Sequence, residues 1–262
     1  MKGDTASGPS ATMIDLHCHP LPGIDDGVRT AEDGVALLAG LRSLGIETVV
    51  ATPHVRTGVW DNRAESRASA HAALGPALDA ARAAGTALPT LCLAGEHMFD
   101  DVLRDLLARG EALTYPGGGA ALVEFAYDNI PLRVELQLWR MARAGVRPVL
   151  AHPERYVPVQ QSDERLEELI GAGVWPLLDT MSLVGAYGRR AQAAAERFLA
   201  AGKYVAACSD AHKPADVPVL REALGALSRA VGPDGVRRLW VDGPRRVLSA
   251  AAAPAEKKGG NE

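Results

Sequence analysis

The sequence has 262 residues, 47% of them hydrophobic and 23% charged, and its formal net charge is −4. This length and composition suit one large globular domain or two small ones, and the charge gives no footprint for nucleic acid or an anionic membrane. No apolar run approaches the ~18 residues of a membrane span, no signal-peptide core is present, and three scattered cysteines make no disulfide framework. We therefore expect a cytoplasmic protein without membrane insertion or nucleic-acid partners.

The expected elements begin after residues 1–12, which are small and polar and are expected to be a disordered tail, with Met13 as an alternative start to Met1. Seven short apolar stretches then alternate with helical patterns. Strands are expected at 13–19, 47–52, 90–94, 120–123, 148–151, 175–179 and 204–208. Helices are expected at 30–44, 61–84 (broken or kinked near Gly75 and Pro76), 99–109, 132–144, 163–171, 187–201, 216–231 and 244–252. Residues 253–262 are expected to be a second disordered tail, which leaves one domain over 13–252.

Alternation of strands and helices implies a parallel sheet, either open or closed into a barrel. Six of the seven expected strands carry His, Asp or Glu at their C-terminal end. A closed ring lets all these ends converge on one centre, whereas an open sheet spreads them apart. The fold class is therefore predicted to be α/β, a distorted (β/α)7 barrel.

The polar strand ends predict a metal site. His17 and His19 are two residues apart in a strand, so their side chains should lie on the same side. Neutral imidazole and ionised carboxylate are ordinary ligands of divalent metals. The candidate metal ligands are His17, His19, Asp26, His54, Glu96, Glu124, His152, Asp210 and His212.

Four nearby polar residues have other interpretations. Asp15 is expected to hydrogen-bond a ligating imidazole and fix its tautomer. Asp179, at the end of the sixth strand, is expected either to hydrogen-bond a metal ligand in the same way or to cap a helix. His71 is expected to be solvated on its helix, and His97 is expected to point away from the side that Glu96 faces.

The number of metals follows from charge. The four candidate carboxylates bring four negative charges, so a single divalent ion would leave them crowded and repelling. Three ions would leave a surplus of about two positive charges to bind hydroxide and an anionic substrate. A multinuclear centre polarises a phosphoryl oxygen and lowers the pKa of bound water toward ~7. The predicted chemistry is phosphoester hydrolysis assisted by two or three divalent ions.

These motifs resemble those of the PHP (polymerase and histidinol phosphatase) superfamily, and their whole pattern resembles the manganese-dependent tyrosine phosphatases of bacterial capsule and exopolysaccharide clusters. The similarity covers about Met13 to His212 and lies in His17-Cys18-His19, Thr52-Pro53-His54, Glu96, Glu124, His152-Pro153-Glu154-Arg155-Tyr156 and Ser209-Asp210-Ala211-His212. The resemblance implies the TIM-like PHP fold and Mn²⁺, with Fe or Zn as alternatives. The family spacing favours Asp26 over Asp25.

The resemblance also implies how the ligands are shared. One metal would be held by His17, His19, Glu96 and Asp210, with Glu96 bridging. Glu124 and His152 would complete a second metal. The third metal would be held by Asp26, His54 and His212.

Two cationic residues are substrate-binding candidates. By resemblance, Arg155 is a catalytic, phosphate-binding arginine, because a guanidinium can clamp phosphate with two parallel hydrogen bonds; the alternative is a surface ion pair with Glu154 or another neighbour. The family commonly has another arginine soon after its Asp-x-His. Here Lys213 follows His212 instead, and the next arginine is Arg221 on an expected helix.

Three functions fit these residues. The first is a protein-tyrosine phosphatase acting on a phosphotyrosine protein, a bacterial tyrosine kinase that regulates capsule or exopolysaccharide synthesis. The second is a small-molecule phosphatase of the histidinol-phosphate type, and the third is a metal-binding regulator without catalysis, against which the intact ligand set argues. The three cysteines lack the following arginine that a cysteine phosphatase needs, and they are expected to be buried free thiols: Cys18, Cys92 and Cys208.

Overall fold

The computed structural model describes residues 12–60 and 63–251. Apart from Thr12, the two expected tails therefore lie outside the described residues. The strands are β1 Met13–Cys18, β2 Ile46–Ala51, β3 His54–Val55, β4 Thr90–Leu93, β5 Glu96–Met98, β6 Ala120–Glu124, β7 Arg147–Ala151, β8 Trp175–Asp179 and β9 Ala206–Cys208. The α-helices are α1 Ala31–Ser43, α2 Ala64–Ala83, α3 Asp101–Arg109, α4 Val134–Arg143, α5 Val157–Gln161, α6 Asp163–Gly171, α7 Arg189–Ala200, α8 Asp216–Arg237 and α9 Gly243–Leu248.

The strands form two parallel sheets that together make a distorted barrel. One sheet has the order β1-β2-β4 and the other has the order β3-β5-β6-β7-β8-β9. A bridge between Cys18 and Ala211 joins β1 to the segment after β9, and the backbone N–H of His19 donates to the Ala211 carbonyl over 2.9 Å. The first and last strands thus meet, as the predicted closed ring requires.

The described residues contain two more strands than the seven expected. β3 continues the line of β2 after Thr52 and Pro53, and β5 continues the line of β4 after Ala94 and Gly95. Both interruptions fall at the same level, because β2 pairs with β4 and β3 pairs with β5. Pro53 has no N–H to donate to a ladder. The interruption separates the two sheets and leaves His54 and Glu96 at the start of the second one.

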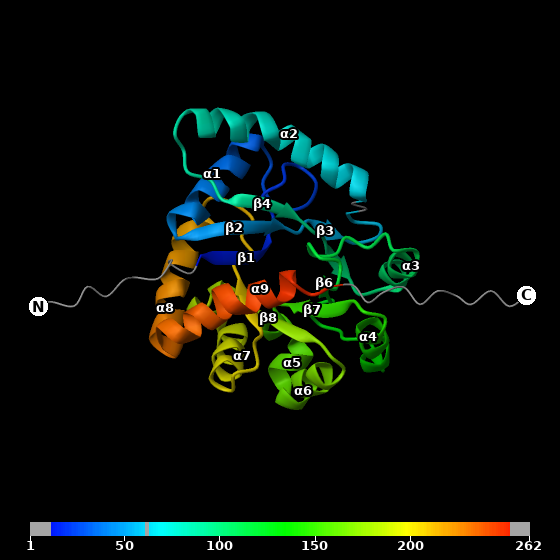
Figure 1. Cartoon of the computed structure of the whole chain (residues 1–262). Coiled ribbons are helices and arrows are strands. Elements are labelled where there is room, and N and C mark those ends of the chain that lie inside the picture. Colours follow the sequence, from blue (N-terminus) through cyan, green and yellow to red (C-terminus); the bar gives the residue numbers. More distant parts are fainter. Residues whose placement is uncertain (1–11, 61–62, 252–262) are drawn as a thin grey trace, which may run out of the picture.

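Two hydrophobic clusters hold the barrel together. The inner faces of the strands pack on one another inside the ring, with Leu16, Leu122 and Leu177 among the buried residues, and a larger cluster fills the layer between strands and helices. Figure 1 shows the helices around the outside and α9 crossing the barrel. α9 contacts β1 and β9, and Gly243 at its start lies close to the Val205 carbonyl just before β9. α9 therefore covers the N-terminal end of the ring and leaves the C-terminal end to the polar residues.

Several expected helices differ from those observed. α2 runs without interruption through Gly75 and Pro76, so the expected break is absent; Pro76 and Ala72 are exposed, and water can satisfy the carbonyl that a proline leaves without a partner. α8 continues past residue 231 to Arg237, across a local break at Gly232, where φ is +66°. α5 was not expected. No helix in the described ranges is long and apolar enough to cross a membrane.

Candidate metal centre

All nine candidate ligands lie together at the C-terminal end of the barrel. Within the described residues, four overlapping groups place one ligand atom of each member within 4.8 Å of the others. The groups are His17, His19 and Glu96; His17, His152 and Asp210; His54, Glu96 and Glu124; and His19, Asp26, His54 and His212. His152 is grouped with His17 and Asp210 and not, as the resemblance implies, with Glu124.

Glu96 is the centre of the buried part. Its Oε1 lies 3.3 Å from His17 Nε2 and 3.2 Å from His152 Nε2, and its Oε2 lies 2.9 Å from His54 Nδ1. Asp210 Oδ1 lies 3.0 Å from His17 Nε2 and 3.3 Å from His19 Nε2. Because the two oxygens of Glu96 face different imidazoles, this carboxylate has the geometry of a bridging ligand.

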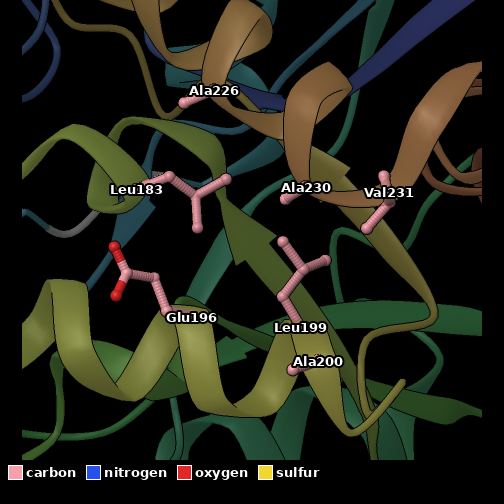
Figure 2. Close-up of a pocket in the computed structure, with 7 residues that line it drawn as sticks. All are labelled: Leu183, Glu196, Leu199, Ala200, Ala226, Ala230 and Val231. Atoms are coloured by element: carbon pink, nitrogen blue, oxygen red, sulfur yellow. The ribbon is translucent and has the colours of Figure 1, made fainter.

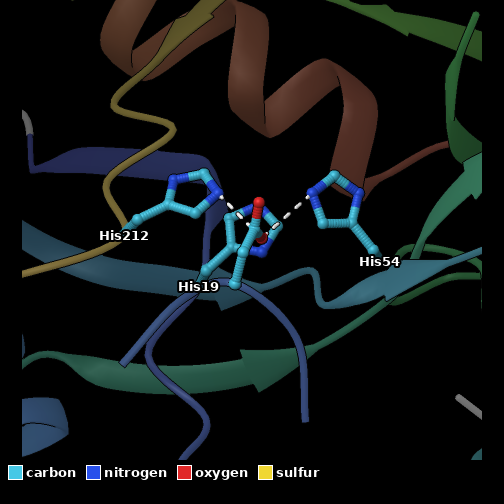
Figure 3. Close-up of side chains that lie close together, drawn as sticks. His19, His54 and His212 are labelled. Carbon is cyan, nitrogen blue, oxygen red and sulfur yellow. Dashed lines mark ion pairs between the residues drawn. The ribbon is translucent and has the colours of Figure 1, made fainter. Parts of the chain in front are cut away.

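The group around Asp26 forms the mouth of the centre. Asp26 Oδ1 lies 3.4 Å from the Nε2 atoms of both His54 and His212, and Figure 3 shows these two rings on either side of His19. The ring of His19 stacks on that of His212 at 4.0 Å between centroids. The side chain of Asp26 is 50% exposed, whereas that of Glu96 is fully buried. The centre therefore extends from the barrel interior to the surface.

The buried atoms fit bound divalent cations. Eight buried side-chain nitrogen and oxygen atoms of the described residues have no hydrogen-bond partner, and four of them belong to the group of ligand atoms that face one another: His17 Nε2, His19 Nε2, Glu96 Oε2 and Asp210 Oδ1. Buried polar atoms nearly always have a partner, and nitrogen and oxygen atoms directed at one another at these distances are the donors that a divalent metal takes. The donor set contains no thiolate, which suits Mn²⁺, Fe²⁺ and Zn²⁺ alike.

Two imidazoles are oriented by residues outside the ligand set. His17 Nδ1 lies 2.6 Å from Thr52 Oγ1, and His19 Nδ1 lies 2.8 Å from Asp25 Oδ2. These contacts leave the Nε2 atoms to face the cluster, as outer hydrogen bonds do for metal-bound histidines. Thr52 was not predicted as a partner of His17, and Asp25 was predicted only as an alternative ligand to Asp26.

The prediction for Asp15 is wrong. Its Oδ1 accepts from the backbone N–H groups of His17 and Ser209, and its Oδ2 accepts from the Ser209 hydroxyl over 2.5 Å. No imidazole of the described residues is its partner. Asp15 thus joins β1 to the segment after β9. The register of β1 on β2 shifts between Asp15 and Cys18, and such irregularities change the direction of side chains.

Backbone strain is concentrated in the ligand set. Three described residues other than glycine have a positive φ, and two of them are His152, at +36°, and Asp210, at +48°. A positive φ is energetically costly for residues with a Cβ. It is found at functional sites, where contacts with the surrounding structure maintain the strained backbone. The strain supports a functional role for the turns after β7 and β9.

The electrostatics of the cluster favour cations. Burial disfavours charge on His17, but the carboxylates of Glu96 and Asp210 raise the pKa of His17 well above its usual value. Burial likewise disfavours charge on Glu96, but His17 and His54 hold the pKa of Glu96 well below its usual value. For His152, burial and the nearby Arg155 lower the pKa to about 4, so this imidazole is neutral near pH 7. Binding of divalent cations is therefore expected to release protons from the cluster.

Arg155 reaches the cluster from the turn after β7. Its Nη1 donates to Asp210 Oδ2 over 2.5 Å and lies 3.4 Å from Asp179 Oδ2. Its side chain is 14% exposed. Glu154 instead points into the core and accepts from Ser182 and Tyr204, so the alternative of a surface ion pair with Glu154 is wrong. Asp179 has the second of its two expected roles, because its Oδ1 caps the turn at Met181, while its Oδ2 faces Arg155 and not an imidazole.

Lys213 and Arg155 line different cavities. Lys213 is exposed, and together with Arg29, Asp26 and His212 it lines a cavity of about 320 Å³. Arg155 belongs to a different cavity, of about 260 Å³. The Lys213 cavity is thus lined by two candidate ligands, Asp26 and His212, whereas the Arg155 cavity adjoins the cluster through Arg155, which bonds to Asp210.

The remaining candidates have structural roles. His97 is buried and its Nε2 accepts from the backbone N–H of Leu113 over 3.1 Å, and His71 is partly exposed on α2. Cys18 and Cys208 are buried as expected, but Cys92 is only partly buried. A separate cavity of about 150 Å³ between α7 and α8 (Figure 2) has apolar walls apart from Glu196 and contains none of the candidate residues.

Comparisons with known proteins identify the family of this chain. A sequence model described as "Capsular polysaccharide synthesis, CpsB/CapC" matches residues 13–249. The tyrosine-protein phosphatase YwqE of Bacillus subtilis (strain 168) is 30% identical over 202 residues, which are 76% of this chain and 77% of YwqE. The tyrosine-protein phosphatase CpsB of Streptococcus pneumoniae is 26% identical over 244 residues, 90% of this chain and 98% of CpsB.

Solved structures show the same fold. One from a study of YwqE and CpsB, described as metal-dependent tyrosine phosphatases, has a TM-score of 0.80 at 25% identity and covers 94% of this chain and 100% of its own. The phosphotriesterase homology protein of Escherichia coli has a TM-score of 0.54 at 10% identity, with 91% of this chain and 99% of that one covered. The second similarity concerns the fold alone and supports a distorted TIM-like barrel.

Proposed function

Because the chain belongs to the CpsB/CapC family of capsular polysaccharide synthesis, we propose that it is a metal-dependent protein-tyrosine phosphatase of the PHP superfamily. The observation that carries the proposal is the cluster of nine His, Asp and Glu side chains with Arg155 bonded to one of them. The names of the relatives YwqE and CpsB support tyrosine phosphatase activity. The intact cluster argues against a regulator without catalysis.

The nine candidate ligands would hold two or three divalent ions, with Glu96 bridging. Bound ions would polarise the phosphoryl group and supply a water of lowered pKa as the nucleophile. Thr52 and Asp25 keep the imidazoles of His17 and His19 turned toward the ions. We propose Mn²⁺ as the metal on the family resemblance, with Fe or Zn as alternatives that the donor set also permits.

Arg155 is proposed to bind the substrate phosphate. Its guanidinium is held beside the cluster by Asp210 and Asp179, so it can add a charge-assisted hydrogen bond to a phosphate on the metals without a large rearrangement. Lys213, exposed in the other cavity, is proposed as a second cationic contact for the substrate. An ammonium on a flexible stem acts there as a point charge and not as a fork.

A protein substrate is favoured over a small metabolite. Asp26 is half-exposed, and Tyr127 beside Arg155 is 46% exposed, so the centre opens to the surface at its mouth. An enclosed site with many converging polar groups would be expected for a small metabolite. The partner is proposed to be a phosphotyrosine protein, a bacterial tyrosine kinase whose dephosphorylation regulates capsule or exopolysaccharide synthesis, and the location is proposed to be cytoplasmic.

The test combines activity with metal content. Purified protein should hydrolyse a phosphotyrosine peptide, lose this activity with a chelator and regain it best with Mn²⁺. Elemental analysis of the active protein should give two or three divalent ions per chain, and removal of the ions should lower the melting temperature because they bind only the folded state. Activity that survives complete removal of metal, or an active protein with a single ion, would contradict the proposal.

A further inference from the structure

A small cavity lies beside Arg155 and is separate from the cavity that Lys213 lines. It is lined by Tyr127, Arg155, Gln160, Tyr187 and Ala191 and has a volume of about 260 Å³. Sites for drug-sized ligands usually measure about 300–1,000 Å³. The cavity therefore has the size for one side chain, and two of its five lining residues are aromatic.

The two aromatic rings enclose the guanidinium of Arg155. Its central carbon lies 5.0 Å from the ring centroid of Tyr127 and 4.0 Å from that of Tyr187. Nη2 donates to the Tyr127 hydroxyl over 2.5 Å, while Nη1 is held by Asp210. Stacking and hydrogen bonds thus fix the guanidinium at the boundary between the metal cluster and the aromatic cavity.

Tyr127 is placed to meet a substrate as well as Arg155. It lies in the loop that follows β6, three residues after the candidate ligand Glu124, and its ring centroid is 6.0 Å from that of His152. Large aromatic side chains usually bury most of their surface, yet Tyr127 is 46% exposed. An exposed aromatic surface therefore lies within one side-chain length of the cluster.

The cavity around Lys213 lacks such an aromatic lining. The cavity around Lys213 is lined by Asp26, Gly27, Val28, Arg29, Asp33, His212, Lys213 and Pro214, among which there is no phenyl, phenol or indole ring. Its charged walls suit polar groups of a substrate. One further aromatic ring borders the cluster, because the indole of Trp60 stacks on the candidate ligand His54 at 4.8 Å between centroids, but Trp60 lines neither cavity. Of these two cavities, the one beside Arg155 is the one that offers phenol rings to the ring of a bound phosphotyrosine.

We propose that the cavity of Tyr127, Tyr187 and Arg155 is the subsite for the aromatic ring of phosphotyrosine, and that the two tyrosines make the site prefer aryl over alkyl phosphomonoesters. The inference rests on the proposed function and deepens it. A phosphate on the cluster would meet the edge of Arg155, and the attached ring would extend into the cavity along the tyrosine faces. Aromatic rings attract each other in offset or edge-to-face arrangements at centroid distances of ~4.5–7 Å.

The test measures binding of two non-hydrolysable probes, phenylphosphonate and methylphosphonate, to the metal-loaded protein by calorimetry. The wild-type protein should bind phenylphosphonate more tightly. Tyr127→Leu and Tyr187→Leu should each weaken phenylphosphonate by roughly three- to ten-fold, and methylphosphonate by less than about two-fold. Tyr127→Phe keeps the ring and should retain the preference for phenylphosphonate.

Trp139→Leu is the matched control. Trp139 is 49% exposed, close to the value for Tyr127, but it does not line the cavity, so this variant should bind both phosphonates like the wild-type protein. Equal affinity of the wild-type protein for the two probes would overturn the proposal. So would equal weakening of both probes in the leucine variants, because the tyrosines would then act only by holding Arg155. Failure to hydrolyse a phosphotyrosine peptide, with the phenyl preference intact, would remove the proposed function and leave the aromatic subsite standing.

Discussion

Replacement of Arg155 by alanine should separate its role toward substrate from its role in the fold. In the metal-loaded protein, Arg155→Ala removes a charge-assisted contact to phosphate worth about 1.5–3 kcal/mol, which corresponds to roughly ten- to a hundred-fold in kcat/KM. Arg155→Lys should recover only part of this loss, because an ammonium cannot reproduce the planar fork.

The same substitution should have a larger effect on stability when the metals are removed. Arg155 faces Asp210 and Asp179, whose side chains are 3% and 0% exposed. Removing one partner of a buried ion pair costs about 3–5 kcal/mol, because the other charge is left without compensation. Bound cations supply positive charge to Asp210, so the loss in unfolding free energy should be smaller in the metal-loaded protein.

The assay is hydrolysis of a phosphotyrosine peptide, with metal analysis and urea unfolding of each variant with and without metal. Arg165→Ala is the matched control: Arg165 is also largely buried, at 19% exposure, but it pairs with Glu135 and Glu168 on the outer helices, so kcat/KM should not change. His152→Ala should lose metal, whereas Arg155→Ala should keep it. Wild-type kinetics in a fully metallated Arg155→Ala protein would refute the reasoning and direct the search for the phosphate contact to Lys213.

Three further predictions follow from the contacts of single residues. Thr52→Val removes the hydroxyl beside His17 at nearly constant volume and should weaken metal binding by roughly ten- to a hundred-fold; unchanged affinity in a chelator competition would show that Thr52 does not orient this imidazole. His97 is buried, and burial lowers its pKa to about 4 from the usual 6.5. Between these two pH values the unfolded state binds a proton at His97 that the folded state does not bind. The free energy of unfolding should therefore fall as the pH drops from 6.5 toward 4, by up to about 3 kcal/mol. Metal-free His97→Gln should show a flatter decrease in this range, and equal slopes in urea unfolding would contradict the assignment. Catalysis should not need a thiol, so a folded variant with serine in place of Cys18, Cys92 and Cys208 should keep its phosphatase activity. A loss of turnover in this variant would contradict hydrolysis by a metal-activated water.

The parts of the fold that follow from local periodicity could be predicted. β8 and α6 have the predicted bounds, 175–179 and 163–171, because an apolar run or an amphipathic pattern is bounded there by clear helix and turn signals. β3 and β5 could not be predicted, since two or three residues carry no periodicity and their pairing depends on the interrupted neighbours. α5 begins at Val157 with Pro158 in its first turn, and its five residues are too few for a helical pattern.

The candidate site shows the same division between local and long-range information. Polar residues at strand ends predicted which side chains converge, because parallel strands bring their C-terminal ends to one edge. The partners of those side chains depend on contacts across the barrel. Asp15 bonds to Ser209, which is distant in sequence, and Tyr127 and Tyr187 lie in connecting segments where no pattern singles them out. Thr52 was detectable only as part of the motif that contains His54.

The closure between β1 and the segment after β9 has a consequence for synthesis of the protein. Cys18 and His19 complete their pairing only with Ala211, and Asp15 only with Ser209. At ~5–20 residues per second, a ribosome needs roughly ten to forty seconds after making His17 to reach Asp210. During this interval β1 has an unpaired edge, which is open to pairing with other chains, and the imidazoles of His17 and His19 lack Asp210. Metal loading should therefore follow completion of the last strand. Nascent chains that end before Ala211 should neither retain metal nor resist aggregation.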